Sequence, residues 1–292
     1  MKTYTAKVFD ETKYSLGEGP YFDPRFKRFS WVDITQNKLY TLSADGEKTE
    51  FDLGQPVGAA IPLKYGEGFL LAAADGLYSY ENGKARLAKD LRKAYKPYWR
   101  SNDAKADPEG RIFFGASVRD DVHEAEGALF SYDASLRVGH VDSLVTCIQS
   151  GTKISNGMAW SSDRTRFYFS DSLEHAVFVY DYDVETGNIG GRQVLFTVED
   201  GLPDGMTIDA EDNLWLAVWG GSRIEKRDGK TGKLLARIDV PAKHTSSCCF
   251  GGDDMRTLYI TSSGDGLEGE HDGCIFTCEL DVKGVAPDYA KI

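Results

Sequence analysis

One loop-and-strand pattern recurs six times along the chain, and this repeat constrains the fold more than any other feature. Each copy contains a polar or Gly-containing loop, an apolar residue, a turn with Asp, Gly or Pro, and a strand. The six copies read LGEGPYFDPRFKRFSWVDI, GAAIPLKYGEGFLLAAAD, RSNDAKADPEGRIFFGA, ISNGMAWSSDRTRFYFSDS, LPDGMTIDAEDNLWLAVW and TSSCCFGGDDMRTLYITSS. Further strands such as KLYTL or GALFSYDAS, and then KTEFDL or LLARIDV, follow most copies. Units of about 40–55 residues with several short strands are typical of four-stranded propeller blades.

The repeats predict an all-β fold, a six-bladed β-propeller with four-stranded blades around a central channel. Six units fill residues 1–292, so we expect a single domain. A β-sandwich would also explain the alternation of apolar and polar residues, but it gives no reason for one pattern to recur six times. No segment has a long helical period, and only Lys89–Tyr98 is predicted to form a short turn of helix.

The repeats also place side chains around the axis of such a propeller. The copies align on the apolar residues that open their turns, which are Phe22, Leu63, Ala106, Trp160, Ile208 and Phe250. Four positions earlier, the copies carry Glu18, Ala59, Asn102, Asn156, Asp204 and Ser246. Because equivalent positions are related by rotation about the channel, we expect these six side chains to form a ring.

Three members of this ring carry oxygen donors and precede a glycine. Glu18 and Asp204 offer carboxylates, and Asn156 offers an amide oxygen. Glycine at the next position lets the backbone turn tightly where a ligand is approached. Oxygen donors favour one divalent hard cation, Ca²⁺, Mg²⁺ or Mn²⁺, with Zn²⁺ less natural. Each residue alone is also ordinary turn chemistry, but together at one repeat position they indicate a shared metal.

The charge of the chain excludes several classes of partner. With a formal net charge of -12, a sequence-independent grip on nucleic acid or anionic lipid is not expected. No secretory signal is visible, and the longest strongly apolar stretch, around Phe69–Ala74, is too short to span a bilayer. We therefore expect a cytoplasmic protein with no membrane association, no obligate protein partner and five reduced cysteines.

Familiar hydrolase motifs do not account for a site. The sequence has no GxSxG nucleophile elbow, and its five histidines lack the HExxH spacing. Cys274 and Cys278 have no second Cys or His pair at the spacing of a zinc site. The ring of oxygen donors is therefore the leading candidate for chemistry.

Five segments of the chain resemble a known family. LGEGPYFDP, RSNDAKADPEGR, SNGMAWSSD, PDGMTIDAEDNLWLA and TSSCCFGG are similar, in order and spacing, to signature segments of the SMP-30/gluconolactonase/regucalcin family. The resemblance covers almost the whole chain and implies a six-bladed propeller of metal-dependent lactonases. It assigns the metal ligands to Glu18, Asn156 and Asp204. Asp204 is then also the base that takes a proton from the attacking water.

The resemblance also implies a set of substrate-binding residues. Arg100 and Asn102 match the RxND segment, and Asp120 is the closest match to a further acidic residue, with Asp121 its neighbour. The family commonly has Glu at that acidic position, so the shorter side chain leaves the sugar preference open. Arg100 alternatively forms a salt bridge to one of many acidic residues. The neighbouring Trp99 either walls the pocket or belongs to the blade core.

The sequence therefore predicts metal-dependent hydrolysis of a sugar (aldono-)lactone, such as glucono-, galactono-, arabino- or xylonolactone, to the aldonic acid. A cation at the hub would polarise the carbonyl and lower the pKa of bound water. Two alternatives remain open, a propeller hydrolase for other esters or organophosphates and a non-catalytic calcium-binding or regulatory propeller. Two carboxylates, an amide and an arginine at the hub favour an enzyme, because an interaction propeller does not need them.

Overall fold

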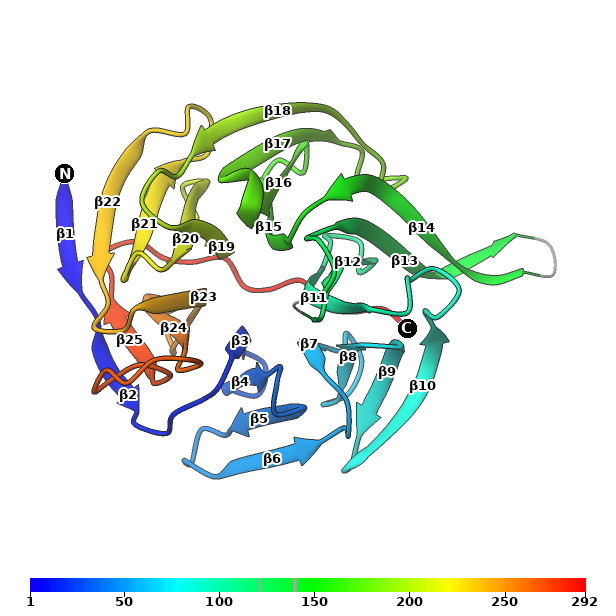
Figure 1. The fold of residues 1–292 in the computed structure, drawn as a ribbon, viewed down its shortest axis with the longest axis horizontal. Coiled ribbons are helices and arrows are strands. Elements are labelled where there is room, and N and C mark those ends of the chain that lie inside the picture. Colours follow the sequence, from blue (N-terminus) through cyan, green and yellow to red (C-terminus); the bar gives the residue numbers. More distant parts are fainter. Residues whose placement is uncertain (121, 139–140) are drawn as a thin grey trace.

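The computed structural model describes residues 1–120, 122–138 and 141–292. These residues form six β-sheets arranged as blades around a central channel, so the predicted six-bladed propeller is confirmed (Figure 1). From the channel outward, the first three blades are β3 (Gly17–Asp23), β4 (Arg28–Asp33), β5 (Lys38–Leu42) and β6 (Lys48–Asp52); β7 (Val57–Pro62), β8 (Phe69–Ala73), β9 (Gly76–Glu81) and β10 (Lys84–Asp90); and β11 (Trp99–Ala106), β12 (Ile112–Val118), β13 (Gly127–Val138) and β14 (Val141–Thr152). The next three are β15 (Ser155–Trp160), β16 (Arg166–Asp171), β17 (Ala176–Tyr182) and β18 (Ile189–Thr197); β19 (Leu202–Ile208), β20 (Asn213–Trp219), β21 (Arg223–Asp228) and β22 (Leu234–Asp239); and β23 (His244–Gly251), β24 (Thr257–Ser263) and β25 (Ile275–Glu279), completed by the N-terminal β2 (Lys7–Asp10).

The N-terminal segment closes the ring. β2 pairs antiparallel with β25, with Lys7 opposite Thr277, and so supplies the outermost strand of the last blade. β1 (Lys2–Thr5) pairs parallel with β22 of the preceding blade, with Lys2 opposite Ala236. The first residues of the chain therefore join two blades whose other strands lie more than two hundred residues away in sequence.

The short turn of helix predicted at Lys89–Tyr98 is present only in part, as a single turn after β10. Pairing of Lys89 with Leu77 keeps the start of this segment in the second blade. Only one hydrogen-bonded turn follows, in which the Tyr95 N–H donates to the Leu91 carbonyl at 2.8 Å. Within the described ranges, the one helical element is a 3₁₀ turn at Ser172–Glu174, and no helix there is long and apolar enough to cross a membrane.

The aspartates of the repeat close the turns after the inner strands. In the third blade, Asp107 Oδ1 accepts the backbone N–H groups of Glu109 and Arg111, each at 2.9 Å. In the fifth blade, Asp209 Oδ1 accepts those of Glu211 and Asn213 at 3.0 and 2.9 Å. An Asp side chain that bonds the backbone two residues on stabilises a turn, so this repeat residue helps to fix where the inner hairpins of the third and fifth blades reverse.

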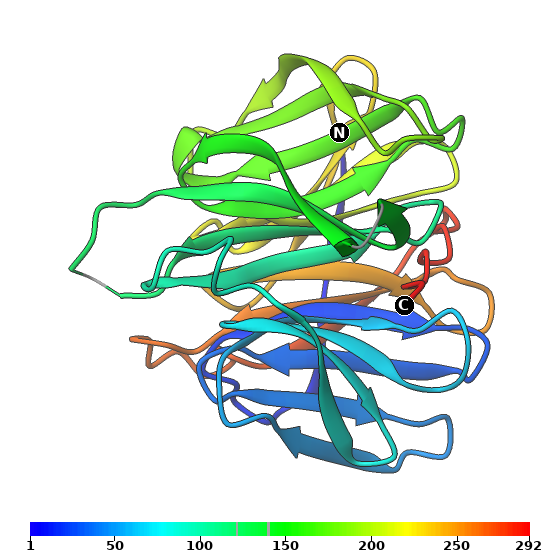
Figure 2. The same ribbon diagram turned by 90° about the vertical axis from the view of Figure 1, so that its right-hand side faces the viewer.

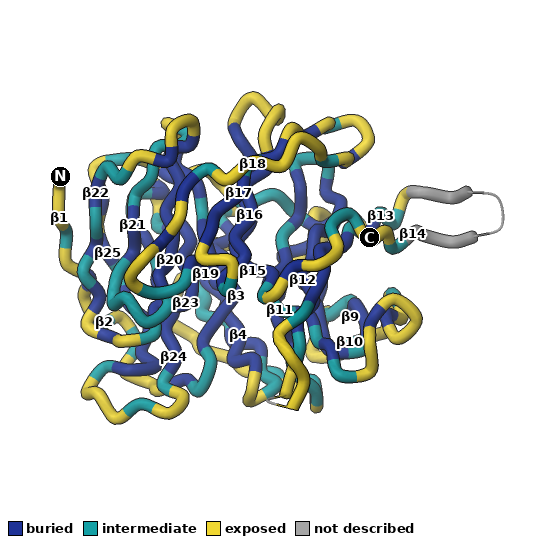
Figure 3. Tube along the Cα trace, turned by 45° about the horizontal axis from the view of Figure 1, so that its top comes forward, coloured by how far each residue is buried: buried dark blue, intermediate teal, exposed yellow. Residues whose placement is uncertain are grey.

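Burial decreases from the channel to the outside of the ring, as Figure 3 shows. Every residue of β3, β7 and β8 is buried, whereas most residues of the outer strands β6 and β10 are at least partly exposed. The apolar core lies between the blades, where Trp31 and Trp215 are among the largest fully buried side chains.

The C-terminal segment, residues 282–292, crosses one end of the channel, and we call it the C-terminal strap. It bridges Gly284 to Asp209 in the fifth blade and Ala290 to Leu63 in the second. Figure 1 shows it in red across the centre of the ring. In Figure 2 it lies at one face, and the orange loop between β24 and β25 projects from the opposite face. The strap therefore leaves the other end of the channel for the candidate site.

Candidate functional site

A cavity of about 260 Å³ lies at the end of the channel where the inner strands begin. Five of the six predicted site residues line it, and these are Glu18, Arg100, Asn102, Asn156 and Asp204. The other lining residues are Leu16, Ile34, Ile154, Ser172, Leu202 and Trp219. Residues from five strands, from Glu18 to Trp219 in sequence, thus meet around one space.

A β-bulge near the ring position aims these side chains at the channel. The inner strands lose their pairing register between Ser101 and Ala104, Ser155 and Met158, and Pro203 and Met206. The other three inner strands also shift register, in the first blade just after Glu18. A bulge leaves residues out of the ladder and turns them away from the regular alternation of the strand. Asn102, Asn156 and Asp204 all lie in such unpaired stretches.

The glycines that follow the oxygen donors allow the inner strands to approach closely. A Cβ on Gly157 would lie 2.5 Å from the Asp204 carbonyl oxygen, and one on Gly205 would lie 2.0 Å from Ser247 Oγ. Gly19 has a φ of +50°, in the left-handed region that favours glycine. Each glycine is therefore required by the backbone next to its donor.

A chain of hydrogen bonds connects Arg100 to Asn156. Arg100 Nη1 donates to Asn102 Oδ1 at 2.7 Å, and Asn102 Nδ2 donates to Asn156 Oδ1 at 3.1 Å. Asn156 Nδ2 donates to Ser172 Oγ at 2.9 Å. Because the amide nitrogen of Asn156 is held by Ser172, its oxygen remains on the side of Asn102 and keeps a lone pair for a further partner.

Two carboxylates share this desolvated hub. Burial, together with the negative charge of Asp103, raises the pKa of Glu18 to about 8. Burial and the nearby charges of Glu18 and Asp103 raise the pKa of Asp204 well above its usual range. Asp204 Oδ1 is buried and accepts no hydrogen bond from the described residues. For both acids to be ionised together in this buried site, a positive partner must offset their repulsion and desolvation.

The donor set fits a hard divalent cation. Glu18 and Asp204 supply anionic oxygens, and Asn156 supplies a neutral one. No three His, Cys, Asp or Glu side chains of the described ranges form a metal site, so the third protein donor would be the amide. A cation here would restore the ionised form of both acids, because an opposite charge lowers their pKa.

Arg100 does not form the alternative salt bridge. Among the residues described its guanidinium forms no ion pair with a carboxylate, and Nη1 donates to Asn102 Oδ1 and to the Ser101 carbonyl. Burial lowers its pKa to about 10, so it remains protonated at neutral pH. Trp99 packs in the hydrophobic core, as one of its two predicted alternatives stated, and it is not among the residues that line the cavity.

Asp120 lies apart from the cavity, on the exposed loop after β12. Its Oδ1 is 2.8 Å from His123 Nδ1 and accepts the backbone N–H groups of Val122 and His123. Hydrogen bonds from His123 lower the pKa of Asp120. These local bonds occupy its carboxylate, and its role in substrate binding stays a prediction; Asp121 is outside the described residues.

The sequence reasoning missed Ser172 and Trp219. Ser172 Oγ also donates to the Pro203 carbonyl at 2.8 Å and so supports the strand that carries Asp204. Trp219 is the cross-strand partner of Leu202, the residue that opens β19. Pairing the end of LWLAVW with the start of LPDGM would have indicated Trp219. Ser172 gives less signal, because it is the last residue of its repeat copy and begins the 3₁₀ turn after β16.

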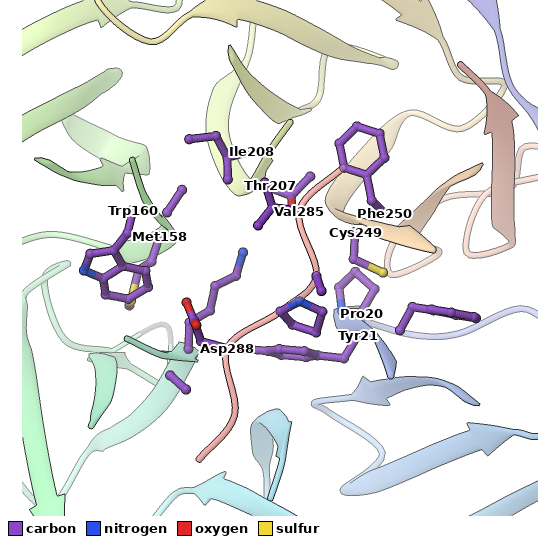
Figure 4. Close-up of a pocket in the computed structure, with 16 residues that line it drawn as sticks. Pro20, Tyr21, Met158, Trp160, Thr207, Ile208, Cys249, Phe250, Val285 and Asp288 are labelled. Atoms are coloured by element: carbon purple, nitrogen blue, oxygen red, sulfur yellow. The ribbon is translucent and has the colours of Figure 1, made fainter. Parts of the chain in front are cut away.

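A second cavity of about 90 Å³ lies at the strap end of the channel. Five of the six apolar residues that align the repeats line it, and these are Phe22, Ala106, Trp160, Ile208 and Phe250. Figure 4 shows Val285 and Asp288 of the strap facing the inner strands across this space. The repeat thus builds a polar ring at one end of the channel and an apolar ring at the other, which the strap covers.

Comparison with known proteins identifies one family and relatives that match nearly the whole chain. The sequence model of a family described as the SMP-30/gluconolactonase/LRE-like region matches residues 16–264. The chain is 35% identical over 300 residues to regucalcin of Danio rerio, covering 98% of each chain. It is 36% identical over 288 residues to the pentonolactonase XacC of Haloferax volcanii, covering 94% of each.

A solved structure agrees in fold over the whole chain. The crystal structure described as a calcium-binding protein, regucalcin, from Agrobacterium tumefaciens superimposes with a TM-score of 0.90 at 28% identity. The match covers 100% of this chain and 99% of that one.

Proposed function

The chain belongs to the SMP-30/gluconolactonase/LRE-like family, and we propose that it is a metal-dependent hydrolase that opens a sugar lactone to the aldonic acid. One observation carries the proposal, the convergence of two carboxylates, an amide and Arg100 on one cavity at the hub. The pentonolactonase among the relatives supports a hydrolase of the lactonase kind.

Glu18, Asn156 and Asp204 would hold one divalent cation. Ca²⁺ is the first choice, because all three donors are oxygens and a relative in the same fold is described as calcium-binding. Mg²⁺, Mn²⁺ and Zn²⁺ are the other ions to test. When bound, the cation would polarise the lactone carbonyl and offset the charge that develops on its oxygen.

Asp204 is the proposed base. Its orphaned Oδ1 is available to accept a proton from water while the water oxygen bonds to the carbonyl carbon. The ring C–O bond then breaks, and the proton passes to the departing ring oxygen. One water is consumed, and the products are a carboxylic acid and a hydroxyl group on the same open chain.

Arg100 and Asn102 are the proposed ligands of the sugar hydroxyls. Arg100 carries five N–H donors, and only Nη1 is engaged by its two acceptors. Its remaining donors can bind hydroxyl or carbonyl oxygens of a ring, while Asn102 holds the guanidinium in place. This arrangement suits a neutral, hydroxyl-rich substrate.

A panel of aldonolactones, followed by release of acid with a pH indicator, tests the proposal. We expect hydrolysis that stops in EDTA and returns when Ca²⁺, Mg²⁺, Mn²⁺ or Zn²⁺ is restored. Hydrolysis of simple esters or organophosphates alone would favour the related-hydrolase alternative. Calcium binding measured by calorimetry without turnover of any lactone would favour the non-catalytic alternative.

A further inference from the structure

Five apolar residues line the candidate site, and none of the proposed catalytic roles uses them. Leu16, Ile34, Ile154, Leu202 and Trp219 line the cavity together with the polar residues. Trp219 is the only aromatic residue among the cavity-lining residues described. It ends β20 directly opposite Leu202, which lies two positions before Asp204 on β19.

His244 fixes the orientation of Trp219. The indole and imidazole rings are stacked, with centroids 4.1 Å apart and planes inclined by 13°. His244 Nδ1 is buried and has no hydrogen-bond partner in the described residues. With one face covered by His244, the indole can offer the cavity only its other face and its edge.

We propose that Trp219 is a specificity-determining platform on which the C–H face of a lactone ring packs, and that His244 is the residue that positions it. This inference rests on the proposed function and deepens it. An indole presents a large rigid apolar surface at low cost in conformational entropy. A ring that lies flat on it can direct its hydroxyls to Arg100 and Asn102 and its carbonyl to the acidic hub. The substrate class is then a cyclic polyhydroxy ester, recognised by its ring as well as by its hydroxyls.

Steady-state kinetics on the lactone panel tests the platform. We expect Trp219→Ala to raise KM about tenfold and to leave kcat within about twofold, because a lost packing surface acts mainly on substrate binding. Trp219→Phe, which retains a flat ring, should recover most of the affinity. Trp160→Phe is the matched control, since Trp160 lines only the cavity at the strap end and should leave KM unchanged.

A double-mutant cycle tests the positioning role. His244→Ala should raise KM by less than Trp219→Ala does, and the double variant should behave like Trp219→Ala alone. Additive effects would assign His244 a contact of its own and overturn its positioning role. A Trp219→Ala variant with unchanged KM, or with lower kcat at constant KM, would overturn the platform.

Binding of a non-hydrolysable ring separates this inference from the proposed function. If the wild-type protein hydrolyses no lactone, the proposed function fails. Calorimetry with a 1,5-anhydrohexitol then decides the platform. If the wild type binds the anhydrohexitol and Trp219→Ala binds it about tenfold more weakly, the platform proposal holds. If both proteins bind it equally, or neither binds it, the platform proposal is wrong.

Discussion

Glu18 is a buried acid whose protonation must influence the stability of the metal-free protein. Burial and the negative charge of Asp103 raise its pKa from 4.5 to about 8 in the folded chain. Below pH 4.5 the folded and unfolded chains both carry the proton, and the stabilising contribution is fully present. As the pH rises toward 8, the unfolded chain ionises first, so stability is lost.

The magnitude follows from the gap between the two pKa values. Each unit corresponds to about 1.4 kcal/mol, so Glu18 accounts for at most about 5 kcal/mol of stability lost by the time the pH exceeds its folded pKa. This is a large share of the roughly 5–15 kcal/mol that stabilises a typical domain. A cation that binds only the folded protein opposes the loss, by about 2.7 kcal/mol at one hundred times its Kd.

Urea unfolding between pH 5 and 8.5, in EDTA and in Ca²⁺, measures this effect. The free energy of unfolding of the metal-free wild type should fall as the pH rises across this range. Ca²⁺ should make this pH dependence smaller. In EDTA, Glu18→Gln should reduce the slope of the unfolding free energy against pH by the contribution of one titrating group. The same variant should gain less stability from Ca²⁺. Asp90→Asn is the matched control, because an exposed acid whose pKa is lowered to about 2 is ionised throughout the range.

Two results would refute the reasoning. Equal stability of the metal-free wild type at pH 5 and pH 8 would mean that the hub does not penalise the ionised acid. A Glu18→Gln variant with the wild-type slope would mean that another group titrates.

Three further predictions concern the base, the inner strands and the strap. Asp204→Asn, with metal occupancy checked by calorimetry, should lower kcat at least 100-fold, and near-normal turnover would exclude Asp204 as the base. Gly205→Ala places a Cβ 2.0 Å from Ser247 Oγ and should lower the free energy of unfolding by about 1–3 kcal/mol in urea melts; an unchanged midpoint would contradict the close packing. Gly284→Ala places a Cβ 2.0 Å from the Phe250 ring and should loosen the strap, which limited proteolysis near the C-terminus would detect as faster cleavage.

The number of blades and the ring position can both be read from the amino-acid sequence. Six copies of one pattern are visible without a structure, and a residue that recurs in each copy must recur by rotation in the fold. Repetition of the spacing from Phe22 to Glu18 therefore predicted that Glu18, Asn102, Asn156 and Asp204 line one cavity, whereas Ala59 and Ser246, at the same repeat position, are not among its lining residues.

How those side chains are held, and what surrounds them, follows from contacts between strands in the folded chain. The bulge at Asn156, the pairing of Trp219 with Leu202 and the closure of the last blade by β2 depend on hydrogen-bond register between strands. A one-residue change in register reverses which face a side chain occupies, and no single strand encodes that choice. The raised pKa of Glu18 likewise arises from burial by neighbours from other blades, because desolvation is a property of the assembled hub and not of any segment.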